Sequence, residues 1–282
     1  MKFKSADKVA LDISGQKFKK SFNKLDSAEL PGVKAENATA DEIEAALRAD
    51  ANRLRSELVE LQAKLYSEGK QRLLIVLQAM DTGGKDGCIR NVFSGCNPMG
   101  VKVARFEKPT PDELARDYLW RVHPKVPDNG YITIFNRSHY EDVLVVRVQN
   151  IVPEKRWAKR YSHISNFETM LVDEGTKILK FFLHIDKDEQ KVRLQERLDD
   201  PAKQWKFDSN DLVQREKWDE YLAAYADAVH KTHQKHAPWF VIPAKKNWYR
   251  DWAVLKIVVN QLREMNPKFP KPTFDPATVV IA

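Results

Sequence analysis

The fold class can be predicted from residues 72–87, which read Arg-Leu-Leu-Ile-Val-Leu-Gln-Ala-Met-Asp-Thr-Gly-Gly-Lys-Asp-Gly. Residues 72–78 form a short, almost continuous apolar run, which is the pattern of a strand buried on both faces. A glycine-rich turn follows at residues 79–87, and a helix is predicted from about Asp86. A buried strand, a glycine-rich turn and a helix in this order are typical of a P-loop, which binds phosphate groups.

The turn contains the groups that a phosphate-binding loop needs. Backbone N–H groups and the positive end of the following helix hold phosphate oxygens, and a lysine reaches the outer phosphates. The predicted phosphate-binding residues are Thr82, Gly83, Gly84, Lys85, Asp86 and Gly87. The usual pattern is G-x-x-x-x-G-K-[ST], and Ala79 and Asp86 depart from it. An ordinary glycine-rich turn between a strand and a helix is therefore the alternative.

A metal ion is expected beside this loop. The carboxylate of Asp81 would repel bound phosphates unless a cation lay between them, so Asp81 is a candidate Mg²⁺ ligand. A further strand, residues 131–135, is followed by Asn136 and Arg137 at a position where nucleotide-binding sheets place their ligands. Asn136 is a poor substitute for the metal-binding Asp that is frequent there, which again favours Asp81. Glu141, about one helical turn later, is a second candidate metal ligand.

Arg137 has the chemistry to bridge two phosphate groups. Its planar guanidinium can bond a donor phosphate and an acceptor phosphate at the same time. The alternative for Asn136 and Arg137 is a capping asparagine and a surface arginine.

Strands and helices alternate along the rest of the chain. Further strands are predicted at residues 101–106, 178–185 and 239–242, and helices at 41–66, 110–122, 153–173, 188–198, 208–236 and 248–264. This alternation predicts an α/β fold with a parallel five-stranded sheet covered by helices. We expect three parts: an exposed basic N-terminal arm at 1–38, one kinase domain at 39–266, and an extended C-terminal tail at 267–282.

A mobile lid is predicted at about residues 190–210. This segment carries four cations, Arg193, Arg197, Lys203 and Lys206, and the Asp-Asp-Pro at 199–201 is expected to end its helix. Nucleotide kinases close such a segment over their phosphates, which excludes water and adds positive charge. A solvated helix face is the alternative, because most runs of charge have that role.

The acceptor nucleotide is expected near residues 106–121. Phe106 could stack on a base, although an aromatic residue at a strand end is as often part of the core. The predicted nucleotide-binding residues are Phe106, Lys108, Asp117, Arg121, Asn136 and Arg137.

Charge and composition limit the possible partners. The 282 residues carry a formal net charge of +7, which predicts attraction to a polyanion. No apolar run approaches the roughly 20 residues that cross a bilayer, so no membrane partner is expected. The start of the chain has no apolar centre and does not resemble a targeting segment. Two cysteines, Cys88 and Cys96, are not expected to pair, which favours a reducing cytoplasm.

Four stretches together resemble the polyphosphate kinase 2 family. They are residues 78–87, 106–114, 135–147 and 197–207, and they follow the order found in the family. The resemblance implies a thymidylate-kinase-like P-loop kinase fold with a helical lid, dependence on Mg²⁺ with Mn²⁺ as a substitute, and a homo-oligomer, either a dimer or a tetramer.

The resemblance also implies a reversible reaction. The terminal phosphoryl group of inorganic polyphosphate would pass to AMP, giving ADP, or to ADP, giving ATP; guanine nucleotides are further candidates. The implied catalytic residues are Asp81, Lys85, Arg137 and Glu141. The Tyr-Glu-Asp-Val sequence at residues 140–143 is similar to the class III subgroup, which acts on both AMP and ADP.

Three rival interpretations remain open. An ATP-dependent nucleoside monophosphate kinase shares the P-loop and the lid, but it needs a second base pocket instead of a long basic groove. A nucleic-acid-binding protein would fit the pI of about 9.2, would bind with steep salt dependence and would transfer no phosphate. A catalytically silent binding module is disfavoured by intact Asp81, Lys85 and Arg137, and no nucleic-acid partner is expected.

Overall fold

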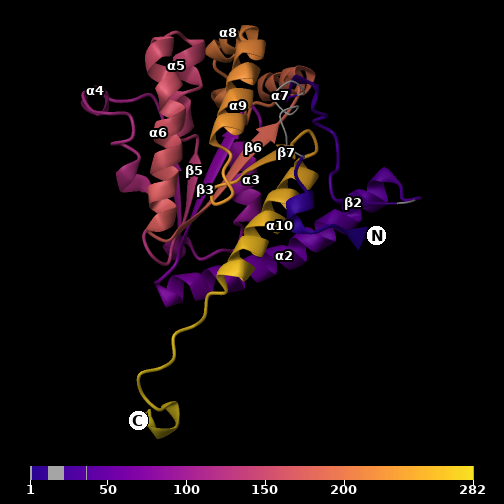
Figure 1. The fold of residues 1–282 in the computed structure, drawn as a ribbon. Coiled ribbons are helices and arrows are strands. Elements are labelled where there is room, and N and C mark those ends of the chain that lie inside the picture. Colours follow the sequence, from indigo (N-terminus) through magenta and orange to yellow (C-terminus); the bar gives the residue numbers. More distant parts are fainter. Residues whose placement is uncertain (1, 12–21, 36, 282) are drawn as a thin grey trace.

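The fold is a parallel α/β sheet, as the sequence predicts. The computed structural model describes residues 2–11, 22–35 and 37–281. Its main sheet has the strand order β4-β5-β3-β6-β7, with every neighbouring pair parallel (Figure 1). The strands are β3 (Arg72–Ala79), β4 (Val101–Arg105), β5 (Ile132–Asn136), β6 (Thr176–His184) and β7 (Trp239–Pro243).

Helices connect these strands. They are α2 (Ala40–Glu68), α3 (Lys85–Val92), α4 (Pro111–Leu114), α5 (Val145–Val148), α6 (Glu154–Asp173), α7 (Lys187–Asp199), α8 (Asn210–Glu216), α9 (Trp218–Thr232) and α10 (Asn247–Met265). Helix α10 packs against α2 and α3, and α6 packs against α9 and β6 (Figure 1). Shorter 3-10 turns include η5 (His139–Asp142) and η6 (Gln204–Lys206).

The sheet is the centre of the core. Residues 73–77 of β3 are each at most 1% exposed, because β5 and β6 flank this strand and helices cover both of its faces. Burying one aliphatic side chain of this size contributes about 1.5–3 kcal/mol, so the central strand is a rigid support for the turn that follows it.

Two predicted helices are shorter than expected. The helix predicted at 110–122 is reduced to α4, because Asp117 Oδ1 accepts hydrogen bonds from the backbone N–H groups of Leu119 and Trp120 and so favours a turn. The helix predicted at 208–236 is divided at Lys217 into α8 and α9, and it ends at Thr232. Lys217 Nζ donates to Val148 O at 3.3 Å, which holds the break against α5.

The expected exposed arm at residues 1–38 is wrong for several of its residues. Val9, Leu11 and Phe22 are buried, and Leu11 N donates to Val241 O at 2.8 Å on the edge of β7. Tyr249 of α10 donates to Val9 O at 2.8 Å. Apolar side chains within the basic segment therefore pack on the sheet edge and on α10. The lysines of residues 12–21 lie outside the described residues.

The C-terminal segment is more exposed than the described residues of the N-terminal segment. Residues beyond α10 leave the body of the molecule and expose large apolar side chains, with Val280 88% exposed (Figure 1).

Cys88 and Cys96 are both free thiols. Within the described residues, the helices are all too short or too polar to cross a membrane.

Candidate active site

The site lies at the carboxyl ends of the central strands. In the sheet register Leu77 is opposite Asn136, and Asn136 is opposite Arg105, so β3, β4 and β5 end side by side. A cavity of about 680 Å³ opens there. Nine lysines and arginines line it, against five aspartates and glutamates, so the cavity attracts a polyanion.

The glycine-rich turn is folded as a phosphate-binding loop. Thr82 and Gly84 have φ angles of 62° and 88°, and Gly83 N donates to Met80 O at 2.9 Å. A side chain at Gly83 would put its Cβ 2.5 Å from the Cβ of Ala79, so the turn requires glycine there. Helix α3 begins at Lys85, and its first backbone N–H groups are available for an anion.

Lys85 is held close to this loop. Its Nζ donates to Ala79 O at 3.4 Å, and burial lowers the pKa of the ammonium group while the Asp81 carboxylate acts in the opposite direction. A bound phosphate would offset the cost of burying this charge. All ten residues predicted to bind phosphate line the cavity: the six of the loop and the four lid cations.

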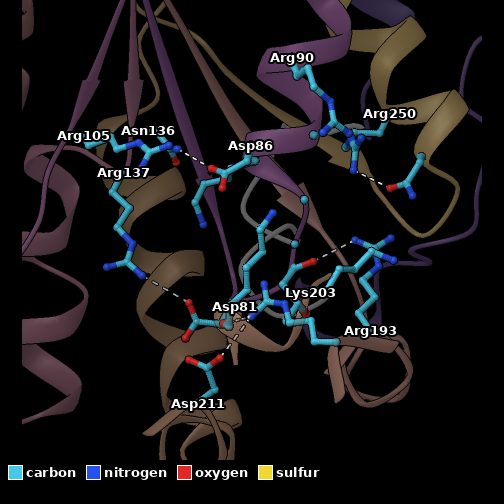
Figure 2. A pocket seen from close by; sticks show the side chains of 18 of the residues that line it. Asp81, Asp86, Arg90, Arg105, Asn136, Arg137, Arg193, Lys203, Asp211 and Arg250 are labelled. Carbon is cyan, nitrogen blue, oxygen red and sulfur yellow. Dashed lines mark hydrogen bonds and ion pairs between the residues drawn. The ribbon is translucent and has the colours of Figure 1, made fainter. Parts of the chain in front are cut away.

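Two further arginines converge on the loop from other elements. Arg193 of α7 donates to Thr82 O at 3.1 Å (Figure 2). Arg250 of α10 is 2% exposed and pairs with Asp251 at 2.7 Å. A Cβ on Gly84 would lie 2.2 Å from Arg250 Nη1, so this guanidinium contacts the loop backbone closely.

Sequence reasoning missed Arg250. The available signal was the pair of polar residues, Asn247 and Arg250, that follows the carboxyl end of β7, where parallel sheets bind ligands. Other cavity residues outside the predicted set are Arg90, Asn91, Arg105, Glu107, Glu196 and Asp211.

The exit of β5 joins the loop through two side-chain pairs. Asn136 Nδ2 donates to Asp86 Oδ1 at 2.6 Å, and Arg137 pairs with Asp81 at 3.5 Å (Figure 2). Arg137 has a φ of 61°, a left-handed conformation that is strained for a residue with a side chain and that recurs at functional sites. Asn136 and Arg137 therefore both face the loop.

Glu141 belongs to η5, which is held in place by contacts with the buried Glu168. The neighbouring Tyr140 is buried, and its hydroxyl donates to Glu168 Oε1 at 2.8 Å; His139 Nε2 lies 3.2 Å from the same oxygen. Burial raises the pKa of Glu141, although Arg137 and Lys85 act to lower it. These contacts hold the Glu141 carboxyl group near both cations.

A second cavity, of about 310 Å³, lies on the Glu141 side. It shares Asp81, Arg137 and Asp211 with the basic cavity. Four carboxylates line it against two guanidinium groups, and the rest of its lining is largely polar and aromatic. The charged residues are Asp81, Glu141, Asp208, Asp211, Arg137 and Arg215, and the others include Gln149, Gln190, Gln214, Trp218, Tyr221 and Tyr225. The two cavities thus meet at Asp81 and Arg137.

The lid segment borders the basic cavity. Arg197 pairs with Asp211 of α8 at 3.3 Å, and Lys203 pairs with Asp200 at 3.0 Å. Trp205, next to Lys206 in η6, is 78% exposed. The exposed Lys203–Asp200 pair contributes little, so a stronger anion can displace it.

The chemistry of the carboxylates fits Mg²⁺. Asp81 is about one-third exposed, and it lines the second cavity together with Glu141. Among the described residues no cluster of three or more His, Cys, Asp or Glu side chains is arranged to hold a metal. Mg²⁺ is commonly held by one or two carboxylates together with substrate phosphates, which is the donor set available here.

Three predicted nucleotide-binding residues are not part of either cavity. Lys108 and Asp117 are exposed, and Arg121 is buried, where it donates to Glu107 O at 3.0 Å and pairs with Glu113 at 3.2 Å. Phe106 lines the basic cavity but is only 2% exposed and packs against Phe135 with centroids 4.8 Å apart. It is a core residue, which is the alternative that the sequence left open.

Comparison with known proteins agrees with this geometry. The family model described as polyphosphate kinase 2 matches residues 42–270. The chain is 59% identical over 228 residues, 81% of its length and 85% of the relative, to an AMP/ADP-polyphosphate phosphotransferase of Meiothermus ruber. It is 40% identical to an ADP-polyphosphate phosphotransferase of Rhodopseudomonas palustris, over 77% of this chain and 79% of the relative.

The solved structures agree as well. Polyphosphate kinase 2 from Arthrobacter aurescens TC1 superposes with a TM-score of 0.89 at 38% identity, over 98% of this chain and 95% of that chain. The P-loop kinase fold is therefore confirmed, and the chain belongs to the polyphosphate kinase 2 family.

Proposed function

We propose that this protein is a Mg²⁺-dependent phosphotransferase that moves the terminal phosphoryl group of inorganic polyphosphate to AMP and to ADP. The observation that carries the proposal is the pair of cavities that meet at Asp81 and Arg137. One cavity is cationic and suits a polyphosphate chain. The other is polar and aromatic and suits a nucleotide.

The donor chain lies in the basic cavity. Lys85 and the loop N–H groups hold its terminal units, and Arg193, Arg197 and Arg250 balance its charge. A donor ATP would need a surface for its base. Phe106 is the only aromatic residue among the described residues that line this cavity, and it is buried. The lining thus favours polyphosphate over ATP as the donor.

The acceptor nucleotide lies in the second cavity. This differs from the position near residues 106–121 that the sequence suggested, because Lys108, Asp117 and Arg121 border neither cavity. Tyr221 offers a ring surface to the nucleotide, and Gln149 and Gln214 offer amide groups. The acceptor phosphate would then lie next to Arg137.

Transfer needs alignment and neutral charge rather than a covalent intermediate. Arg137 can bond the donor and acceptor phosphates together, and Lys85 stabilises the charge on the transferred group. Asp81 and Glu141 would hold Mg²⁺, which when bound neutralises phosphate charge. Closure of the lid cations would exclude water, so that the nucleotide rather than water accepts the phosphoryl group.

The acceptor range rests on two observations. The Meiothermus ruber relative, at 59% identity, is named for both AMP and ADP, and residues 140–143 resemble the subgroup with that range. Guanine nucleotides, a cytoplasmic location, Mn²⁺ as a substitute and a homo-oligomer extend the same proposal.

The acceptor range can be tested with purified protein, Mg²⁺ and polyphosphate, supplying AMP or ADP in separate reactions. We expect ADP from the first and ATP from the second when products are separated by chromatography, and no product when EDTA replaces Mg²⁺. A reaction with ATP and AMP but no polyphosphate tests the rival kinase. Product in that reaction, and none with polyphosphate, would overturn the proposal.

A further inference from the structure

A third cavity lies beside the basic one, outside the site described above. It has a volume of about 360 Å³ and lies between α2, the end of α3 and the start of α10. Its lining is Arg48, Ala51, Asn52, Arg55, Asn91, Ser94, Trp248 and Asp251. Asn91 also lines the basic cavity, so the two cavities are neighbours.

The third cavity lies past the end of the phosphate loop. Asn91 is seven residues after Gly84, which corresponds to about 10 Å along α3 at 1.5 Å per residue. Arg90 and Arg250 lie between, at the edge of the basic cavity away from Asp81 and Arg137 (Figure 2). A phosphate chain that leaves the loop in this direction would pass Arg90 and Arg250.

Arg55 is a cation without a local counter-charge. Its Nε donates to Asn91 O at 2.9 Å and its Nη1 donates to Asn52 Oδ1 at 2.8 Å, and both acceptors are neutral. Among the described residues no carboxylate lies within ion-pairing distance of it. The guanidinium is therefore fixed in orientation while its charge remains available to an anion.

The other charged groups permit an anion. Asp251 is neutralised by Arg250 at 2.7 Å and also accepts a hydrogen bond from Asn91 Nδ2 at 2.7 Å. Arg48 is 62% exposed and pairs with Glu44 on its own helix at 2.6 Å, an exposed pair that a polyanion can replace. Arg48, Asn52 and Arg55 lie on one face of α2, at spacings of four and three residues.

We infer that this cavity is a second polyphosphate subsite, which binds the part of the donor chain that extends beyond the phosphate loop. The inference rests on the proposed donor. Its consequence is selectivity for chain length: a long chain fills both the loop and this subsite, whereas a short chain fills the loop alone. Long chains would bind more tightly than short ones, because binding at the second subsite is intramolecular once the loop holds one end of the chain.

The test is the KM for polyphosphate of different lengths. For the variant R48Q/R55Q we expect the KM for long chains to rise roughly fivefold or more, since two charged contacts are lost. The KM for the shortest fraction that supports transfer should stay within about twofold of the wild type. The control is Arg53→Gln, which removes one positive charge from α2 at a position paired with Asp50 and Glu57 and outside the cavity.

Ser94 provides a second test that leaves α2 unchanged. Ser94 is exposed at the cavity and follows the end of α3. Ser94→Glu should raise the KM for long chains and Ser94→Lys should lower it, and neither should affect short chains.

The possible failures are distinguishable. Equal effects on long and short chains, or no effect of these variants on long chains, would overturn the subsite and leave the proposed function intact. Absence of transfer from polyphosphate of any length by the wild type would instead overturn the proposed function, and the subsite with it.

Discussion

Asp86 and Asn136 exchange the usual positions of a charged and a neutral group. In many P-loop enzymes a Ser or Thr ends the loop and an acidic residue lies at a strand end, and both contact Mg²⁺. Here Asp86 ends the loop, Asn136 lies at the strand end, and the two are hydrogen-bonded at 2.6 Å. Each departure is visible in the sequence, but their pairing is not, because 50 residues separate them.

Asp81 and Glu141 are the proposed ligands of Mg²⁺. The titration of Glu141 should therefore make the activity depend on pH. Burial raises the pKa of Glu141 above its usual value of 4.5, so the carboxylate is lost as the pH falls through that raised pKa. Because the ionised form is needed to hold Mg²⁺, kcat/KM should fall on the acid side at a higher pH than an ordinary glutamate would cause.

This acid limb should disappear in Glu141→Gln, which should also be at least about 100-fold less active. The measurement is kcat/KM for ADP from about pH 5 to pH 8. The control is Asp142→Asn, at the adjacent residue, where burial raises the pKa to about 6 and the carboxylate pairs with Arg160 away from the cavities. An acid limb that persists in Glu141→Gln, or that vanishes in Asp142→Asn, would assign the titration to another group.

The phosphate loop depends on a helix, α10, that is distant from it in sequence. β3, the loop and α3 could be predicted from residues 72–87, because local pattern determines them. The contribution of α10 could not, since Arg250 reaches Gly84 only after the chain has formed four further strands. The helices predicted at 110–122 and 208–236 were too long for a similar reason. Their breaks depend on hydrogen bonds made by Asp117 and Lys217, which helical periodicity does not reveal.

The contact between α10 and the loop predicts the effect of Gly84→Ala. The new Cβ would lie 2.2 Å from Arg250 Nη1, and the backbone has a φ of 88°. We expect a loss of about 1–3 kcal/mol in the free energy of unfolding, together with a roughly tenfold or larger rise in the KM for polyphosphate, because Arg250 must move.

Gly69→Ala is the matched control for this change. Gly69 also has a positive φ, of 63°, at the end of α2, but nothing lies within 4 Å of a Cβ built there. It should cost about 1 kcal/mol in urea unfolding and leave the KM unchanged. Equal KM values for the Gly84→Ala variant and the wild type would show that Arg250 does not act through the loop.

The completed sheet brings a cationic cavity and a second, polar cavity together at Asp81, Arg137 and Asp211. The α/β class and the five parallel strands could be predicted from the alternation of elements. The strand order β4-β5-β3-β6-β7 follows from long-range pairing and could not. The same holds for the second cavity, whose lining residues lie between Ala79 and Tyr225 and are joined only by the fold. The burial of Val9 and Phe22 likewise requires the completed sheet.

The proposed reaction is direct transfer from polyphosphate to a nucleotide at Asp81 and Arg137. The most direct measurement uses polyphosphate labelled with ³²P, unlabelled ADP, Mg²⁺ and no added ATP, and follows the label by chromatography. We predict label in the γ-phosphate of ATP for the wild type, and at least about 100-fold slower labelling for Asp81→Asn and for Lys85→Met. Unlabelled ATP, no ATP at all, or unchanged rates in both variants would contradict direct transfer at this site.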